Sequence, residues 1–361
     1  MPVVATGLVR RRIAFVAVAL AVLVSSVPSW RAGLTAIPTL AESIGIDLPR
    51  PFARPITIHQ AAPPGGLPGD VYEPGLPAPA VVMVPGGTPE GKDDPRVVRV
   101  ARSLAEAGRL VFVPQLELRH RTFVWSDVEG LVRTVLGIAR WPEALGVGMA
   151  GFSYGGSLGL VAAEDPRISG RLDFVATFGS YYELLAVLQG VSTGATTVED
   201  EVIPWETVPE AHEILVDAAV SLAEPADRSS LRSALATGEA HGLSPSARAL
   251  FDLVRNRDPL RTGDLATRLS GSVRATLSKF SPSTRIARLR APLLLMQSVH
   301  DPATPPTEAI RLHRSVPGSK LIILRTFRHV DPPESGTPLA GLTADAWGAW
   351  RFTSWVLAAQ E

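Results

Sequence analysis

The chain has 361 residues, of which 46% are hydrophobic, so it is long and apolar enough to bury one large core or two modest ones. Its 35 lysines and arginines balance its 35 aspartates and glutamates, and this neutral total gives no reason to expect a nucleic-acid partner. The absence of cysteine excludes disulfides, thiolate metal sites and a cysteine nucleophile. The seven histidines show no close ligand spacing, so no metal is expected.

Residues 1–30 have the pattern of an export signal. Arg10, Arg11 and Arg12 precede an uncharged stretch from Ile13 to Val27, and Trp30 follows it. We expect an exported protein, either periplasmic or secreted after removal of a signal peptide, or anchored to the membrane through residues 13–30. The shortness of the uncharged stretch favours a cleaved signal, whereas the lack of an A-x-A site favours a retained anchor. An N-terminal helix buried in the fold is the alternative without targeting.

Residues 31–54 end in several prolines and are predicted to be a linker or a short helix. The folded domain is predicted to span residues 55–361. From residue 55, short β-rich runs alternate with helical stretches, which predicts an α/β fold with a mainly parallel sheet and helices on both faces. The predicted strands are 55–59, 69–74, 80–84, 110–114, 146–150, 173–179, 292–298 and 319–326, and the predicted helices include 94–108, 125–140 and 342–359.

The alternation stops between residues 182 and 285. This part of the chain contains acidic and helical stretches and no strand signal of comparable strength. We interpret it as a helical insertion that forms a cap. The alternative is that these helices belong to the main layer of the domain.

The stretch from Gly151 to Gly156, "GFSYGG", matches the G-x-S-x-G pattern, which is unspecific on its own. Here it follows a predicted buried strand and opens a predicted helix. A sharp turn between the two lifts a serine hydroxyl above the sheet, and small residues at Gly151 and Gly155 let the backbone cross closely. Ser153 is therefore the candidate nucleophile. The alternative is an ordinary glycine-rich turn.

A serine nucleophile needs a base to take its proton and an acid to orient that base. Asp301 follows the predicted strand 292–298 and is the candidate acid, with a helix cap as its alternative role. His329 follows the predicted strand 319–326 and is the candidate base, with an ordinary surface histidine as the alternative. His300 is adjacent to Asp301 and too close in sequence to be oriented by it, and the remaining histidines are interpreted as structural.

The negative oxygen that forms when a serine attacks a carbonyl needs two backbone donors. One candidate is the N–H of Tyr154, at the start of the helix behind Ser153, where the helix dipole also helps. The second is expected from the loop after strand 80–84, which contains Gly86, Gly87 and Thr88. Gly87 and Thr88 stay open as alternatives, and a plain turn is the alternative role of this loop.

With Ser153, Asp301 and His329 in this order, residues 55–359 resemble the α/β-hydrolase superfamily. Three stretches are similar to its dienelactone-hydrolase-like or prolyl-oligopeptidase-like branch: 84–108, 151–168 and 178–188. The resemblance implies a Ser-Asp-His triad, no cofactor, and hydrolysis of esters, less often amides, through an acyl-enzyme. Two features depart from the pattern, because the loop reads "PGG" where many esterases have His-Gly-Gly, and Ser153 stands where dienelactone hydrolases proper use cysteine.

The sequence therefore predicts a serine hydrolase that cleaves a small-molecule carboxylic ester, with the insertion as a lid or cap over Ser153. An apolar acyl pocket is expected beside the nucleophile, and the aromatic candidates for it are Phe152, Tyr154, Tyr181, Tyr182 and Trp205. Ordinary core packing is the alternative role of each. A peptidase or amidase of the same fold is one alternative, although the chain has no repeats that would form a β-propeller. A catalytically inactive, membrane-tethered binding protein is the other.

Overall fold

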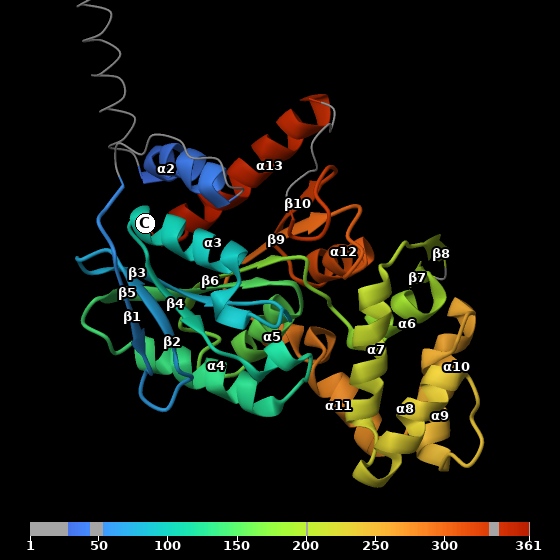
Figure 1. Cartoon of the computed structure of the whole chain (residues 1–361). Coiled ribbons are helices and arrows are strands. Elements are labelled where there is room, and N and C mark those ends of the chain that lie inside the picture. Colours follow the sequence, from blue (N-terminus) through green and yellow to red (C-terminus); the bar gives the residue numbers. More distant parts are fainter. Residues whose placement is uncertain (1–27, 44–52, 200, 332–338, 361) are drawn as a thin grey trace, which may run out of the picture.

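A mixed sheet of eight strands forms the centre of the computed structural model, which describes residues 28–43, 53–199, 201–331 and 339–360 (Figure 1). The strand order is β1-β2-β4-β3-β5-β6-β9-β10; β1 and β2 are antiparallel to their neighbours, and all pairs from β4 to β10 are parallel. The bounds are β1 (Thr57–Ala61), β2 (Gly69–Glu73), β3 (Ala78–Val84), β4 (Leu110–Pro114), β5 (Ala144–Phe152), β6 (Leu172–Phe178), β9 (Leu293–Ser298) and β10 (Lys320–Leu324).

Helices cover both faces of this sheet. One face carries α2 (Pro28–Ser43), α3 (Pro95–Glu106) and α13 (Leu339–Ala358), and the other carries α4 (Trp125–Ile138), α5 (Ser153–Ala163) and α12 (Pro306–Ser315) (Figure 1). Strand β3 shows why both faces are apolar, since Val82 packs with the α4 and α5 layer while Met83 packs against α3. The predicted α/β fold class, a mainly parallel sheet with helices on both faces, is confirmed.

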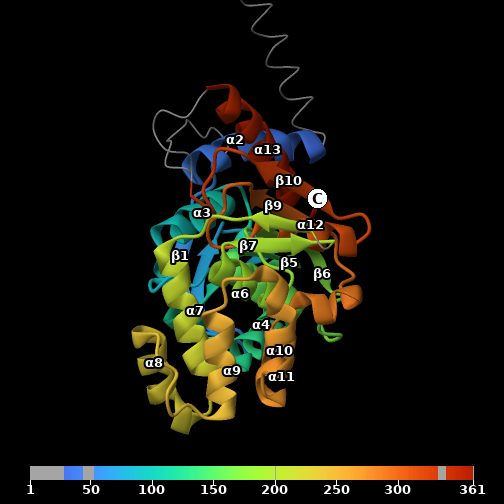
Figure 2. The same ribbon diagram turned by 90° about the vertical axis from the view of Figure 1, so that its right-hand side faces the viewer.

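The chain between β6 and β9 forms a mostly helical body beside the sheet (Figure 2). It also contains a two-stranded antiparallel sheet, β7 (Ala195–Val198) with β8 (Glu201–Pro204), that the sequence did not predict. Neither strand has the alternation of apolar and polar residues that would predict it. The helices are α6 (Leu184–Thr193), α7 (Pro209–Leu222), α8 (Arg228–Thr237), α9 (Pro245–Val254), α10 (Thr262–Thr267) and α11 (Gly271–Lys279).

Helix α2 occupies much of the stretch predicted as a linker or short helix. It begins at Pro28 and packs against α3 and α13. Ala32 and Ala36 are buried in this contact, and the indole Nε1 of Trp350 donates a hydrogen bond to the carbonyl of Gly33 at 2.7 Å. The packed structure therefore begins before residue 55, because α2 belongs to the helical layer over the sheet. Small side chains let these helices approach, a tertiary contact that local sequence does not reveal.

Most of the predicted export signal, residues 1–27, lies outside the described residues, as do residues 44–52 of the predicted linker. In the ranges that are described, no helix has both the length and the apolar character needed to cross a bilayer.

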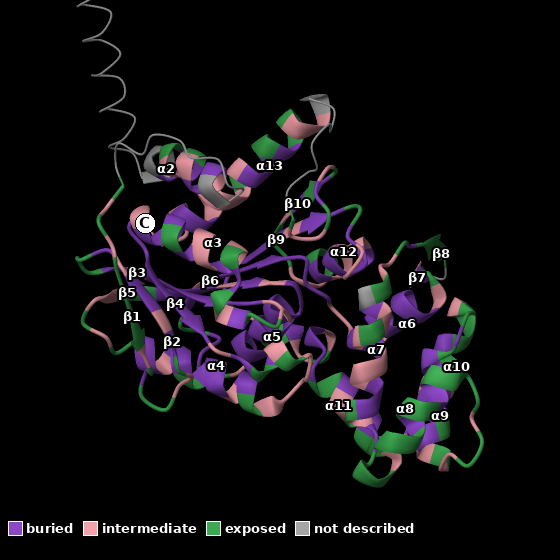
Figure 3. Ribbon diagram, viewed as in Figure 1, coloured by how far each residue is buried: buried purple, intermediate pink, exposed green. Residues whose placement is uncertain are grey.

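The central strands β3, β4, β6 and β9 are buried along nearly all of their length, whereas the edge strand β1 is mostly exposed (Figure 3). Because β3, β5, β6, β9 and β10 run parallel, the segments that follow them meet at one edge of the sheet. The predicted site residues all follow these strands.

Candidate active site

Ser153 lies at the junction between β5 and α5, where the strand ends at Phe152 and the helix starts at Ser153. Its φ angle of 53° is in the left-handed region, which non-glycine residues adopt only when the surrounding structure holds them there. The helix start lies tightly against the end of β3, since a Cβ atom added at Gly155 would sit 1.8 Å from the carbonyl oxygen of Pro85. The strand, sharp turn and helix required of a nucleophile turn are all present.

Asp301 and His329 form a hydrogen-bonded pair. The distance from the imidazole Nδ1 of His329 to Oδ2 of Asp301 is 2.7 Å, and Asp301 is only 1% exposed. The amides of Ala303 and Thr304 donate to Oδ1 at 2.9 and 2.8 Å, and Gln297 Nε2 donates to Oδ2 at 2.8 Å. The carboxylate is therefore held by donors on both oxygens and cannot turn away from His329.

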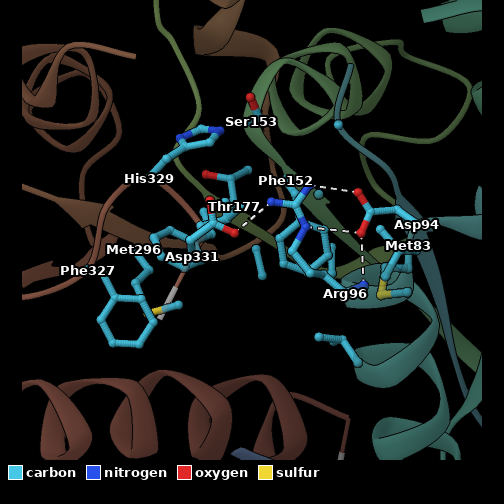
Figure 4. Close-up of a pocket in the computed structure, with 18 of the residues that line it drawn as sticks. Met83, Asp94, Arg96, Phe152, Ser153, Thr177, Met296, Phe327, His329 and Asp331 are labelled. Carbon is cyan, nitrogen blue, oxygen red and sulfur yellow. Dashed lines mark hydrogen bonds and ion pairs between the residues drawn. The ribbon is translucent and has the colours of Figure 1, made fainter. Parts of the chain in front are cut away.

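Two of these three side chains, those of Ser153 and His329, lie at one cavity, and Asp301 lies behind His329. Figure 4 shows the imidazole of His329 pointing toward the hydroxyl of Ser153, and both residues line a cavity of about 400 Å³. His329 also has a positive φ, 55°, in the turn where Arg328 and Asp331 pair through their backbones. Serine, imidazole and buried carboxylate, in this order, can carry a proton away from a nucleophile.

Gly179 lies directly against the Asp301–His329 pair. A Cβ atom at this position would lie 2.9 Å from His329 Cε1, 3.0 Å from its Nδ1 and 3.2 Å from Asp301 Oδ2. Its φ angle of 73° also favours glycine. The sequence did not single out Gly179, although a glycine directly after a strand that neighbours the nucleophile strand was an available signal.

The loop after β3 borders Ser153, as the sequence predicted. A Cβ atom at Gly86 would lie 3.4 Å from Ser153 Cβ, and Gly86, Gly87 and Thr88 all line the cavity. The amide of Tyr154 is in the first turn of α5, where backbone N–H groups have no acceptor within the helix. Gly87 and Thr88 both border the cavity beside Tyr154 and stay open as alternatives for the second donor.

The phenol of Tyr154 supports the loop that carries Asp301. Its hydroxyl donates to the carbonyl of Ala303 at 3.3 Å. Burial, and then the charge of Asp301, raise the pKa of Tyr154 well above its ordinary value, so the hydroxyl stays a donor.

Arg96 connects the start of α3 to the loop that carries His329 (Figure 4). Its guanidinium Nη1 donates to Asp331 Oδ1 at 2.7 Å, and Nη2 donates to Asp94 Oδ2 at 2.7 Å. Asp94 also caps α3 by accepting the Arg96 amide at 2.8 Å. Burial would raise the pKa of Asp94, but the hydrogen bonds from Arg96 outweigh it and lower the pKa. Nothing in the sequence pointed to Arg96.

The predicted acyl pocket is corrected in part. Phe152 and Tyr154 line the cavity, but Tyr181, Tyr182 and Trp205 do not. The hydroxyl of Tyr181 donates to the carbonyl of Phe280 at 3.0 Å, and Trp205 Nε1 donates to the carbonyl of Asp301 at 2.7 Å. Polar tips of buried aromatic residues need such partners, and these partners lie away from the cavity.

The predicted cap also contributes less to the cavity than a lid would. Among the described lining residues, Ile214 of α7 is the only one from residues 182–285. No group of three histidine, aspartate or glutamate side chains in the described part of the chain could hold a metal ion.

No protein-family model matches the chain, and no curated protein matches it in sequence. Among solved structures, it is similar to the acylaminoacyl peptidase of Pyrococcus horikoshii, with 14% identity, a TM-score of 0.47, and coverage of 84% of this chain and 41% of that one. This chain therefore spans about two fifths of the length of that peptidase.

For two further structures, the similarity extends over nearly the whole length of the other protein. The dienelactone hydrolase of Anabaena variabilis has 15% identity and a TM-score of 0.42, over 82% of this chain and 96% of that one. Est1E of Butyrivibrio proteoclasticus has 11% identity and a TM-score of 0.41, over 81% and 96%. The strand order, the antiparallel strand β2 and the nucleophile turn after β5 define the α/β-hydrolase fold, as the sequence predicted.

Proposed function

We propose that this protein is a serine hydrolase that cleaves a carboxylic ester through an acyl-enzyme. One observation carries the proposal: Ser153, on its strained turn, borders the same cavity as a His329 held by Asp301 at 2.7 Å. A left-handed φ at a serine is costly and persists at sites where a side chain must be presented. A buried carboxylate behind an imidazole is the arrangement that orients a catalytic base.

In the proposed reaction, His329 takes the proton of the Ser153 hydroxyl as Oγ attacks the ester carbonyl carbon. The carbonyl oxygen becomes negative and is stabilised by the N–H of Tyr154 and by that of Gly87 or Thr88. His329 then gives the proton to the departing alkoxide, which leaves an acyl group on Ser153. Water, activated by His329 in the same way, releases the acid. Asp301 stays ionised and stabilises the imidazolium.

A covalent probe tests this proposal. A fluorophosphonate probe should label the wild-type protein, and Ser153→Ala should abolish labelling and lower kcat for p-nitrophenyl acetate roughly 10⁶-fold. Ser221→Ala, a change of an exposed serine on α7, is the matched control and should behave as wild type. Labelling that persists in Ser153→Ala would contradict the proposal. If Ser153 is required for cleavage of a peptide substrate and no ester is cleaved, the protein is a peptidase and not an esterase.

For location, we propose that the N-terminal segment takes the protein out of the cytoplasm. The support is the sequence pattern alone, three arginines followed by the uncharged stretch 13–27. The mass of the mature protein distinguishes a cleaved signal from a retained anchor. An unprocessed protein recovered entirely in the soluble cytoplasmic fraction would contradict both.

A further inference from the structure

The cavity beside Ser153 extends along one face of the sheet, between the strands and the helices α3 and α13. The strand register shows this placement. Met83, Ala150 and Ala176 form one row of paired residues across β3, β5 and β6, and Phe152, Phe178 and Met296 form a second row across β5, β6 and β9. Each row points to the face that α3 and α13 cover.

The opposite wall of the cavity is made of helices. Val100 and Leu104 of α3, Phe352 and Val356 of α13, and Leu40 of α2 line it. The charged lining residues are Asp94, Arg96, Arg99 and Asp331, of which Asp94, Arg96 and Asp331 are joined in one ion-pair group. Most of the wall is therefore hydrocarbon.

The side chains between the sheet and the helices α3 and α13 are not closely packed around the cavity. Phe152, Met296 and Phe352 are large apolar residues between a sheet and its covering helices, yet each is only half-buried. Protein interiors are normally close-packed, and a void that leaves such side chains without contacts is unfavourable. Ser153 and His329 line one end of this void, so a molecule bound in it would reach the candidate nucleophile and base.

We propose that this cavity binds the hydrocarbon chain of the acyl group, with the ester carbonyl at Ser153 and the chain running between the sheet and α3 and α13. The inference rests on the proposed function and specifies its substrate class: esters whose acyl group is a medium-length hydrocarbon chain without charged groups. Phe152, Met296 and Phe352 gain in the complex the contacts that they lack in the free protein. Among the described residues of the insertion, only Ile214 lines this cavity.

The first test fills the cavity from α3. Val100→Phe adds a phenyl group to a half-buried lining residue, and Val98→Phe makes the same change two residues away, outside the lining. The measured quantity is the ratio of kcat/KM for p-nitrophenyl octanoate to that for p-nitrophenyl acetate. We expect Val100→Phe to lower this ratio roughly tenfold or more, since the lost space excludes part of the chain, and Val98→Phe to leave it unchanged.

The second test enlarges the cavity. It tests the same proposal independently and therefore still decides it if Val100→Phe does not fold. Phe352→Ala should shift the preferred chain toward p-nitrophenyl decanoate and dodecanoate. Circular dichroism shows whether each variant is folded. An unchanged octanoate-to-acetate ratio in folded Val100→Phe, together with an unchanged preference in Phe352→Ala, would overturn the acyl-chain site.

A binding measurement separates this inference from the proposed catalysis. The Ser153→Ala protein cannot form an acyl-enzyme, but it keeps the cavity and should bind decanoate in isothermal titration calorimetry. Adding Val100→Phe to Ser153→Ala should weaken this binding roughly tenfold or more. Absence of Ser153-dependent ester cleavage with intact decanoate binding would overturn the proposed function alone. Ester cleavage without decanoate binding would overturn the acyl-chain site alone.

Discussion

Gly179 leaves no space for a side chain beside Asp301 and His329, and this makes it a sensitive position. We expect Gly179→Ala to lower kcat about a hundredfold, because the methyl group must displace the imidazole or the carboxylate. Gly75→Ala is the matched control: Gly75 has nearly the same φ, 72°, but no atom lies within 4 Å of an added Cβ. Steady-state kinetics and thermal melting are measured for both variants. Both share the backbone strain of a positive φ, so a loss of activity in Gly179→Ala alone is due to the contact of the new methyl group with His329 and Asp301. Equal loss of activity in the two variants would contradict this explanation.

Glu164 is a buried acid without adequate compensation. It is 1% exposed, its nearest cation is Arg285 Nε at 3.8 Å, and neither oxygen has a hydrogen-bond partner among the described residues. Burial raises its pKa to about 8, and the charges of Arg285 and Arg288 only partly oppose this. The folded state therefore keeps a proton that the unfolded chain has lost above about pH 4.5.

It follows that Glu164 lowers the stability of the protein progressively as the pH rises from about 4.5 toward 8. Glu164→Gln removes this loss, and we expect it to raise the free energy of unfolding by about 1–3 kcal/mol at pH 8 and by much less at pH 5. Urea unfolding at the two pH values measures the difference. Glu239→Gln, at an exposed glutamate, should show no such pH-dependent gain. A gain at pH 5 as large as that at pH 8 would argue against a protonated Glu164.

At the residue scale, the sequence located Ser153, Asp301 and His329 because each follows an apolar strand and parallel strands end at one edge. That reasoning identifies the edge of the sheet at which the site lies and the types of residue that form it. It does not find Gln297 or Arg96, whose contacts with Asp301 and with Asp331 depend on loop conformation and side-chain direction. Tyr181 and Trp205 have the alternative role that the sequence left open for each aromatic candidate, since both are buried and neither lines the cavity.

At the scale of elements, the sequence left residues 31–54 open between a linker and a short helix, and α2 continues through residues 31–43 of that range. Its local sequence, with Pro38 inside the helix, favours a linker, whereas its buried alanines pack on α13. We expect Ala36→Glu to destabilise the protein by about 3 kcal/mol or more, because Ala36 is fully buried and the new charge has no partner. Ile37→Glu is the control, since Ile37 is 49% exposed, and should change stability by less than about 0.5 kcal/mol. Chemical denaturation measures both, and a similar effect in the two variants would show that α2 does not pack as described.

The strands of the main sheet were predictable because their apolar runs are continuous, as in β3 and β4, which are buried along nearly all of their length. The hairpin of β7 and β8 was not, because β8 is exposed at every described position and has no apolar pattern. This hairpin leads directly into two residues that contact the loop of the candidate acid. Trp205 and Thr207 come just after β8 and donate to the carbonyls of Asp301 and Pro302 at 2.7 and 3.0 Å.

At the scale of the whole molecule, these two hydrogen bonds attach the insertion to the loop of the candidate acid. Trp205→Phe keeps an aromatic ring but leaves the buried Asp301 carbonyl without its indole donor. We expect a loss of about 1–3 kcal/mol in stability and a lower kcat at temperatures where the variant is fully folded. Trp347→Phe, at a tryptophan that is 60% exposed, should leave kcat unchanged. A stability loss with no change in kcat would mean that the attachment does not position Asp301.

The candidate site is assembled from segments that are far apart along the chain: residues 86–88, Ser153, Gly179, Asp301 and His329 each follow a different strand. The complete site forms only when β3, β5, β6, β9 and β10 have all paired. Such non-local pairing is slow, because the entropy of closing long loops is lost before the contacts form. During refolding, helical signal would therefore return first and hydrolytic activity last. Recovered activity therefore reports that all five of these strands have joined the sheet.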